Sequence, residues 1–178
     1  MPTATPPDQA SRASRKPIFA VAALVLLHFA ALLACFEPAL STPDANGYTV
    51  QARLLATAGS AGFALESPVQ YVGPHWLAAP GNEFYSKYPP GLPAVMSVVW
   101  RLLGPTAALA VNPVMASLTL LAVFLIGRAW IGAGWGAAAA ALMAVNPFAN
   151  EHALAGDAHT SVAFFLMWGL YALIRWDE

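Results

Sequence analysis

Four runs of uncharged, mostly apolar residues stand out along the chain, each bounded by charged positions. A helix needs about 20 such residues to cross the apolar core of a bilayer, with a range of roughly 17–25. Backbone polar groups in lipid have to pair within their own segment, so we expect each run to be helical. The predicted spans are residues 17–36, 106–127, 130–148 and 158–175. The pattern therefore predicts an all-α fold, that of a polytopic transmembrane protein with four spans.

The segment 37–105, between the first two predicted spans, contains a pattern typical of a surface helix. Within residues 48–58, Tyr48, Ala52 and Ala56 recur at helical spacing on one face. A short amphipathic helix of this kind suits a membrane interface. We therefore expect this segment to be a large loop outside the membrane that carries juxtamembrane helices.

A second short apolar run, residues 88–100, lies in the same loop. Its 13 residues would extend roughly 20 Å as a helix, which is less than the roughly 30 Å of a bilayer core. We expect this run to form a helix at the membrane surface, with the prolines at its start as the entry point. Residues 63–82 show no clear period, and no element is predicted there.

The lysine and arginine positions favour a cytoplasmic N-terminus, because these residues are enriched on the cytoplasmic side of membrane proteins. In that orientation residues 1–16 form a disordered cytoplasmic tail and residues 149–157 form an outer turn. The basic residues on the inner side are Arg12, Arg15, Lys16, Arg128 and Arg175. Those on the outer side are Arg53, Lys87 and Arg101. We therefore expect a multi-pass protein of the plasma (inner) membrane.

Composition supports the same class. Charged residues make up 10% of the chain, against roughly 25% in soluble domains, and hydrophobic residues make up 58%. This balance argues against a soluble globular domain and against a disordered chain. The net charge of −1 offers no basic surface for nucleic acid, and one cysteine, Cys35, excludes a disulfide framework.

A glycine pair, Gly132 and Gly136, precedes a run of alanines in the third predicted span. The G-x-x-x-G spacing predicts close packing of this helix on a neighbour. A dinucleotide-binding loop would need a third glycine and a preceding strand, and the sequence provides neither.

Three charged residues are candidates for chemistry on the outer side: Asp44, Lys87 and Asp157. Each has a simpler interpretation as well. Asp44 and Asp157 both precede predicted helices and could serve as N-caps, for which aspartate is favoured. Lys87 lies between Tyr85 and Tyr88 and could serve as an interfacial anchor.

Two histidines lie near the second of these acids. Glu151, His152, Asp157 and His159 fall within nine residues and offer nitrogen and oxygen ligands. Their spacing matches no standard metal motif, so a solvated turn and a divalent metal site both remain open. No other cofactor is predicted.

Two carboxylates and one lysine at one membrane face suit a substrate with a charged head at the interface and a tail in lipid. A carboxylate can deprotonate an acceptor hydroxyl, and a lysine can pair with a phosphate leaving group. The sequence has no phosphate-cradling loop, which favours a lipid phosphate over a nucleotide as the donor.

These motifs, in this order, resemble those of the GT-C membrane glycosyltransferases. The similarity is greatest to glycosyltransferase family 39, the protein O-mannosyltransferases, and to the aminoarabinose transferases that act on lipid A. It rests on DANGY at residues 44–48, KYPPG at residues 87–91 and the aspartate at residue 157, and it covers roughly residues 17–175.

The resemblance implies a role for each motif. Asp44 would be the general base for the acceptor, Lys87 would contact the donor phosphate, and Asp157 would orient the acceptor or support Asp44. The substrate-binding side chains would also include Tyr48, Tyr88, Glu151 and His159. The implied partners are a polyprenyl-phosphate sugar donor, a lipid, glycan or protein acceptor, and membrane lipids.

The chain departs from this family in three respects. Some members carry an arginine where the second span begins, where this chain has Asn112 and Pro113. Many members have a second acid directly after the first aspartate, where this chain has Ala45. Members also have more spans, so we expect the chain to be an N-terminal part of such an enzyme. Two alternatives stay open: a small non-catalytic protein that binds lipid-linked sugars, and a transporter fragment in which Asp157 and His159 bind a coupling ion.

Overall fold

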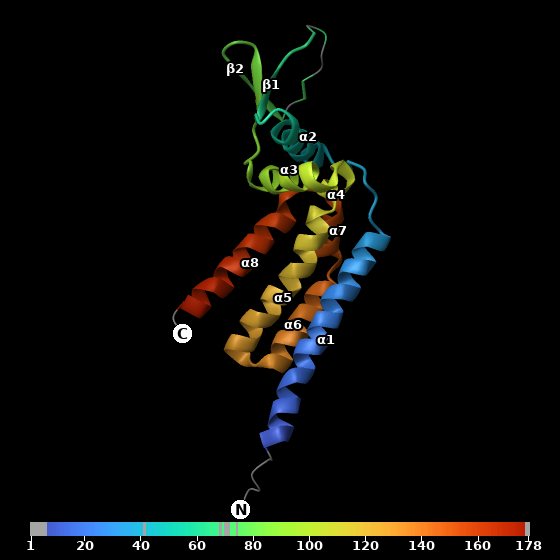
Figure 1. Cartoon of the computed structure of the whole chain (residues 1–178), viewed down its shortest axis with the longest axis vertical. Coiled ribbons are helices and arrows are strands. Elements are labelled where there is room, and N and C mark those ends of the chain that lie inside the picture. The colour runs from blue at the N-terminus through green and yellow to red at the C-terminus, as the bar shows by residue number, and fades with distance from the viewer. Residues whose placement is uncertain (1–6, 41, 68, 70–71, 74, 177–178) are drawn as a thin grey trace, which may run out of the picture.

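The computed structural model describes residues 7–40, 42–67, 69, 72–73 and 75–176, and over these residues the chain is mostly helical. Figure 1 shows a bundle of long helices with a smaller head at one end. Helix α1 begins, and helix α8 ends, away from the head.

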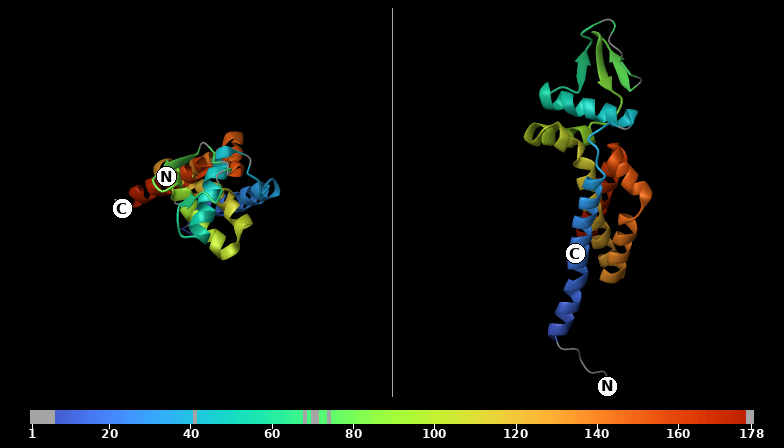
Figure 2. Two further views of the ribbon diagram at one scale, coloured as in Figure 1. Left: turned by 90° about the horizontal axis from the view of Figure 1, so that it is seen from above. Right: turned by 90° about the vertical axis from the view of Figure 1, so that its right-hand side faces the viewer.

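Four helices run along the bundle: α1 (Pro7–Ala34), α5 (Val111–Ile131), α6 (Ala133–Ala144) and α8 (Ala158–Trp176). Helix α5 contacts each of the other three and lies among them (Figures 1 and 2). The buried core of the bundle consists of Val21, Leu120, Phe124, Ala140 and Ala144. Large apolar side chains such as Leu26 and Leu166 stay exposed on the outside, as expected of a surface that faces lipid.

Two helical stretches are long and apolar enough to cross a membrane. One is Pro17–Ala34 within α1, and the other is Pro105–Ile131, which joins α4 (Pro105–Leu109) to α5. A third candidate is α7 (Pro147–Ala155) taken together with α8, a pair bent by 113°. The fold is therefore compatible with a membrane location, and four separate crossings stay a prediction.

The start of α1 differs from the sequence-based expectation. The helix begins at Pro7, whereas the first span is predicted from residue 17 and residues 1–16 are expected to be disordered. Proline is well suited to a first helical turn, and the alanine, glutamine, arginine and lysine that follow are good helix formers. Residues 1–6 of the expected tail lie outside the described residues.

The predicted third span, residues 130–148, is divided among three helices: it begins in the last two residues of α5, continues as α6 and ends at the start of α7. Helix α6 ends at Ala144, and Asn146 caps α7 by accepting the N–H groups of Phe148 and Ala149. A proline at the first position of α7 fixes this new start. The expected outer turn, residues 149–157, is therefore mostly helical.

The head consists of two helices and a small sheet. Helices α2 (Pro43–Thr57) and α3 (Gly91–Leu103) pack on each other across the end of the bundle (Figure 2). Their shared core joins the top of the bundle through Tyr48, Ala52, Leu92, Met96 and Met115. Arg101 of α3 donates to the carbonyls of Leu55 and Ala56 and so caps the end of α2. The two short surface helices predicted from the sequence are thus present.

The sheet corrects the all-α expectation. Strands β1 (Gly62–Ala64), β2 (Trp76–Ala79) and β3 (Glu83–Ser86) are antiparallel in the order β1-β3-β2. Phe63 pairs with Phe84 and makes an edge contact with Trp76 at a ring-centroid distance of 5.0 Å. The positive φ of Gly81 and Asn82 forms the turn between β2 and β3.

The backbones of α5 and α6 make close contact at Gly127 and Gly136. A Cβ at Gly136 would lie 2.6 Å from the carbonyl oxygen of Phe124, and a Cβ at Gly127 would lie 2.6 Å from the Cα of Gly136. The close packing predicted for Gly136 is thus confirmed. Gly132, its partner in the sequence motif, instead forms the α5–α6 turn with a φ of 99°.

We expect Gly136→Ala to destabilise the bundle by about 1–3 kcal/mol, because the added methyl group meets backbone atoms that cannot move aside. The matched control is Gly134→Ala on the same helix, where no atom lies within 4 Å of the added Cβ. Thermal unfolding in detergent should show a lower Tm for Gly136→Ala alone. Equal Tm values for both variants would contradict the close packing of these helices.

Candidate active site

Asp44 lies in the first turn of α2 and is exposed. The N-cap of this helix is Thr42, whose hydroxyl accepts the N–H of Ala45 at 3.1 Å, and Pro43 follows it. The interpretation of Asp44 as an N-cap is therefore wrong, because the cap position is already filled two residues earlier. Its carboxylate is available for other contacts.

The Asp44 carboxylate meets a tyrosine and a histidine from the loop. The hydroxyl of Tyr88 donates a hydrogen bond to Oδ1 of Asp44. The same hydroxyl oxygen lies 2.7 Å from Nδ1 of His75, and because its proton is given to Asp44, the histidine is the donor. Among the described residues no hydrogen-bond partner is found for Oδ2 of Asp44, so this oxygen can accept a proton from a substrate.

Tyr88 is held against α2 by close contacts. Its ring lies 4.6 Å from the ring of Tyr48, and a Cβ at Gly47 would come within 2.8 Å of it. Burial, followed by the hydrogen bond to Asp44, raises the pKa of Tyr88, so its hydroxyl stays protonated at neutral pH. Lys87 is exposed and places its ammonium group 5.3 Å from the centre of the Tyr88 ring.

Asp157 lies at the sharp corner between α7 and α8. Gly156 ends α7 in the left-handed conformation, and Asp157 Oδ1 accepts the N–H of His159, as in an N-cap. Its backbone carbonyl accepts a hydrogen bond from Asn112 of α5 at 2.7 Å. The cap interpretation of Asp157 thus agrees with the geometry, but it accounts for only one carboxylate oxygen.

The two aspartates, far apart in sequence, are brought to one place. A Cβ at Gly156, next to Asp157, would lie 3.5 Å from the Cβ of Ala45, next to Asp44. Tyr48 is buried between them, and its pKa is raised first by burial and then by the charges of Asp44 and Asp157. The charges of both carboxylates therefore act on the same phenol at the junction of head and bundle.

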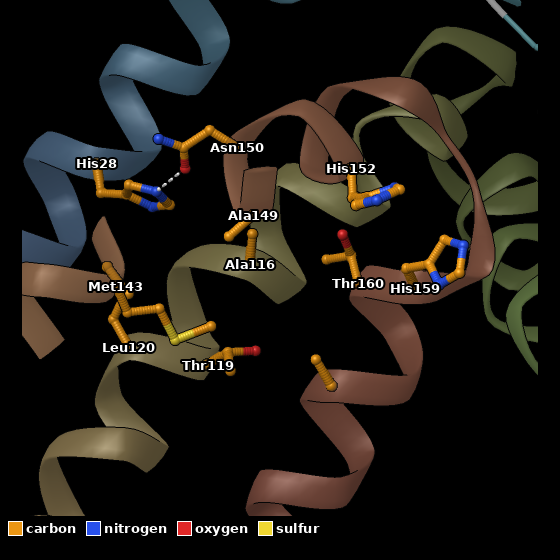
Figure 3. Close-up of a pocket in the computed structure, with 11 residues that line it drawn as sticks. His28, Ala116, Thr119, Leu120, Met143, Ala149, Asn150, His152, His159 and Thr160 are labelled. Atoms are coloured by element: carbon orange, nitrogen blue, oxygen red, sulfur yellow. Dashed lines mark hydrogen bonds between the residues drawn. The ribbon is translucent and has the colours of Figure 1, made fainter. Parts of the chain in front are cut away.

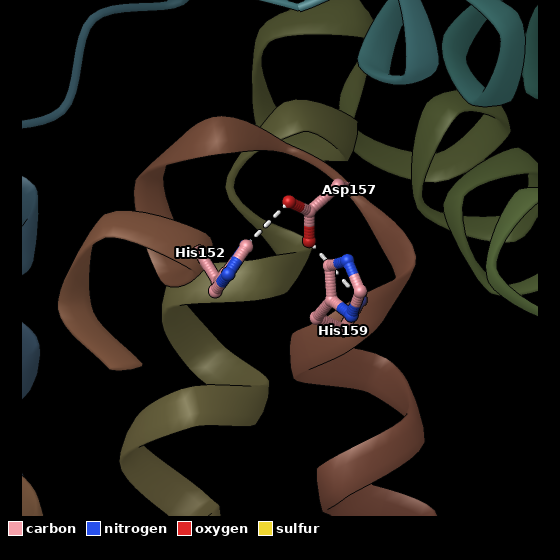
Figure 4. Close-up of side chains that lie close together, drawn as sticks. All are labelled: His152, Asp157 and His159. Atoms are coloured by element: carbon pink, nitrogen blue, oxygen red, sulfur yellow. Dashed lines mark hydrogen bonds and ion pairs between the residues drawn. The ribbon is translucent and has the colours of Figure 1, made fainter. Parts of the chain in front are cut away.

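Three side chains gather at the α7–α8 corner (Figure 4). Nδ1 of His152 lies 2.6 Å from Oδ2 of Asp157, and the rings of His152 and His159 are 4.4 Å apart. The possible ligand atoms of these three residues all lie within 4.8 Å of one another. Glu151, a fourth candidate from the sequence, is exposed and does not belong to this cluster.

A cavity of about 160 Å³ extends beneath the two histidines, between α1, α5, α7 and α8 (Figure 3). Its far side is formed by His28 of α1, whose ring nitrogens lie 2.9 Å from Ser117 and from Asn150. His28 is therefore a buried, hydrogen-bonded polar residue of the first helix.

Two apolar grooves are lined by Phe165 of α8. One, of about 490 Å³, runs from Tyr48 and Pro89 along α8 to Leu166. The other, of about 600 Å³, lies between α3, α5 and α8 and is lined by residues such as Val95, Leu103, Val114 and Leu118. An extended apolar chain could occupy the first groove with its polar end near Tyr48 and the start of α8.

Two residues that contact the candidate site, His75 and Asn112, are not predicted as site residues from the sequence. His75 lies in the stretch without a clear period, and no motif or spacing marked it. Asn112 opens α5 and is buried, and its contact with Asp157 depends on the corner of two distant helices. Its position next to Pro113, at the start of an apolar run, was the one available signal.

The structure therefore brings together Asp44, Tyr48, Tyr88 and Asp157, places Lys87 beside Tyr88, and leaves Glu151 outside. Such a set offers two carboxylates, two neutral phenols and one ammonium group next to an apolar groove. Comparisons with protein-family models, with curated proteins and with solved structures find no match to this chain.

Proposed function

We propose that this protein acts as a membrane glycosyltransferase that moves a sugar from a polyprenyl-phosphate donor to a hydroxyl group of a lipid, glycan or protein acceptor. The observation that carries the proposal is the meeting of Asp44 and Asp157 around Tyr48, beside an apolar groove. The resemblance of the DANGY and KYPPG motifs to the GT-C glycosyltransferases adds to it.

The proposed reaction uses Asp44 as the general base. Its Oδ2 takes the proton of the acceptor hydroxyl, and the acceptor oxygen forms a bond to the anomeric carbon of the sugar. The bond between that carbon and the phosphate oxygen breaks, and its electron pair leaves with polyprenyl phosphate. Tyr88 fixes the orientation of Asp44, and the proposed role of Asp157 is to orient the acceptor or to support Asp44.

Lys87 is the proposed partner of the phosphate. It is exposed next to Tyr88, so its ammonium group can reach a phosphate at the membrane surface. The negative charge that develops on the leaving oxygen would be stabilised by this cation. The prenyl tail of the donor would then occupy the groove that leads from Tyr48 to Leu166.

The proposal also includes an orientation. We place the N-terminus in the cytoplasm and the head outside, with α1, α4–α5, α6–α7 and α8 as four crossings of the plasma membrane. Cysteine introduced at Asn46 or Ala155, in a Cys35→Ser background, should react with an impermeant maleimide from outside intact cells. Reaction at position 155 from the cytoplasm alone would contradict this topology.

The test of the donor class is Lys87→Met. We expect it to weaken the binding of polyprenyl phosphate by roughly tenfold, because a hydrogen bond to a charged group contributes about 1.5–3 kcal/mol. Binding of a labelled polyprenyl phosphate to the chain in lipid nanodiscs measures the effect. Lys87→Arg should retain binding, and Arg128→Met, at the other end of α5, controls for the change in net charge. Unchanged binding in Lys87→Met would leave Lys87 as an interfacial anchor.

A further inference from the structure

We infer that His152, Asp157 and His159 form a binding site for a divalent transition metal ion of the zinc type. The inference concerns the α7–α8 corner and does not depend on the proposed sugar transfer. It starts from the observation that two imidazoles and one carboxylate converge there, with all possible ligand atoms within 4.8 Å of one another.

The corner creates this cluster. In a straight helix, His152 and His159 would be about 10.5 Å apart along the axis, at about 1.5 Å per residue. The bend of 113° between α7 and α8 instead brings their rings to 4.4 Å. Gly156 makes the bend by adopting a φ of 74°, a conformation that glycine adopts readily.

The backbone hydrogen bonds of Asp157 leave its second carboxylate oxygen directed at a histidine ring. Oδ1 is occupied by the N–H of His159, and the backbone carbonyl is held by Asn112. Oδ2 points to His152, whose Nδ1 lies 2.6 Å away. The hydrogen bonds from His159 N–H and Asn112 hold Asp157 in place, as residues around a metal site commonly do for its ligands.

If the cluster served only to form the hydrogen bond between His152 and Asp157, a second histidine beside it would have no role. The His159 ring lies beside that of His152, tilted by 54°, and lines the same cavity on the exposed side of the corner (Figures 3 and 4). Tetrahedral zinc with bonds of about 2.0–2.2 Å needs ligand atoms roughly 3.4 Å apart. To close the set, the exposed His159 ring rotates inward and the contact between His152 Nδ1 and Asp157 Oδ2 lengthens from 2.6 Å to roughly 3.4 Å. The proton on His152 Nδ1 moves to Nε2 through solvent.

The chemistry of the ligands selects the class of metal. Two imidazoles with one carboxylate suit zinc and its neighbours, whereas calcium and magnesium prefer sites made of oxygen ligands alone. Three protein ligands leave a fourth position open, and the adjoining cavity of about 160 Å³ has room for a water molecule there. The C-terminal end of α7 favours a cation at this corner, which offsets the opposite effect of the α8 N-terminus.

The experiment is a zinc titration of the full chain, purified in detergent without a polyhistidine tag and freed of metal with a chelator. Isothermal titration calorimetry should give one bound zinc per chain. His159→Asn and His152→Asn should each weaken the binding by at least about tenfold, since loss even of outer partners costs 10–100-fold. The control is His75→Asn, a histidine of the head outside the cluster, which should bind zinc as the wild type does.

A second readout keeps the test independent of how the variants fold. Cobalt substituted for zinc in the wild-type chain should give the strong visible absorption of a tetrahedral nitrogen and oxygen site, which reports geometry directly. Zinc binding of equal strength in wild type and in the His152→Asn, His159→Asn double variant would overturn the inference. So would the absence of saturable zinc binding to the wild type, or an equal loss in His75→Asn.

Discussion

Asp44→Asn is expected to lower the rate of sugar transfer by roughly 10²–10⁴-fold, the loss that is typical when a positioned general base is removed. The amide cannot accept the proton of the acceptor hydroxyl, but it occupies the same space and can still accept the hydrogen bond from Tyr88. Because Thr42 caps α2, the substitution leaves the cap intact and costs only the favourable charge in the first turn, about 0.3–1 kcal/mol.

The assay for this prediction is the rate at which labelled polyprenyl-phosphate sugar is converted to free polyprenyl phosphate by the chain in nanodiscs. Glu83→Gln is a matched control, because Glu83 also accepts a tyrosine hydroxyl, that of Tyr85 at 2.5 Å, but lies in the sheet. Its rate should equal that of the wild type. If Asp44→Asn retained transfer within a few-fold of wild type, Asp44 would not be the base, and Asp157→Asn would be the next variant to test.

Tyr88→Phe is expected to lower the turnover number by roughly 10–150-fold. The hydroxyl donates to a carboxylate, and such a bond contributes about 1.5–3 kcal/mol, where each 1.36 kcal/mol is tenfold in rate. The substitution also removes the acceptor for the N–H of His75, so the carboxylate and the histidine both lose a partner. The ring itself, with its contacts to Tyr48 and Gly47, is kept.

If Tyr88 only positions Asp44, its loss should lower kcat and leave the affinity for the donor almost unchanged. The turnover number should fall while the affinity for labelled polyprenyl phosphate stays within about twofold of wild type, since Lys87 and the apolar groove are unchanged and each tenfold in affinity needs about 1.4 kcal/mol. Tyr85→Phe, which removes the hydroxyl bonded to Glu83 in the sheet, should leave both quantities as in the wild type. A fall in binding and turnover by the same factor, or no fall at all, would contradict this role.

The helices could be predicted because their signal is local. The apolar run at 158–175 corresponds to α8, Ala158–Trp176, and the short run at 88–100 corresponds to α3, which begins after two prolines. The division of the third span was visible in Asn146 and Pro147, a strong cap followed by a residue that opens helices. It was overlooked because uncharged residues continue through the break.

The sheet could not be predicted from local patterns. Its strands have three or four residues and are held by strand pairing and by aromatic contacts. Phe63, for example, contacts Trp76, 13 positions away, and Phe84, 21 positions away. With so few residues per strand, alternation of apolar and polar positions carries little information. The contact of His75 with Tyr88 could not be predicted for the same reason: the sheet, and not the local sequence around His75, brings the two residues together.

The candidate site was predicted in its residues but not in its geometry. Asp44, Lys87 and Asp157 could be chosen because charges are rare in this chain, and a charge beside an apolar run is conspicuous. That Tyr48 would lie between the two acids depends on the contact of Gly156 with Ala45, which joins the head to the α7–α8 corner. Contacts between distant segments of this kind have no signature in a single sequence.

The most direct measurement of the central claim is the release of polyprenyl phosphate from a panel of labelled polyprenyl-phosphate hexoses and pentoses. The wild-type protein in nanodiscs, together with any C-terminal continuation of the chain, would be incubated with each donor and with a membrane extract as the source of acceptor. If the protein is a glycosyltransferase with Asp44 as its base, at least one donor should release polyprenyl phosphate with the wild type. Asp44→Asn should lower this rate by roughly 10²–10⁴-fold. Donor binding without release above the Asp44→Asn background, for every donor in the panel, would contradict the account and support a non-catalytic protein that binds lipid-linked sugars.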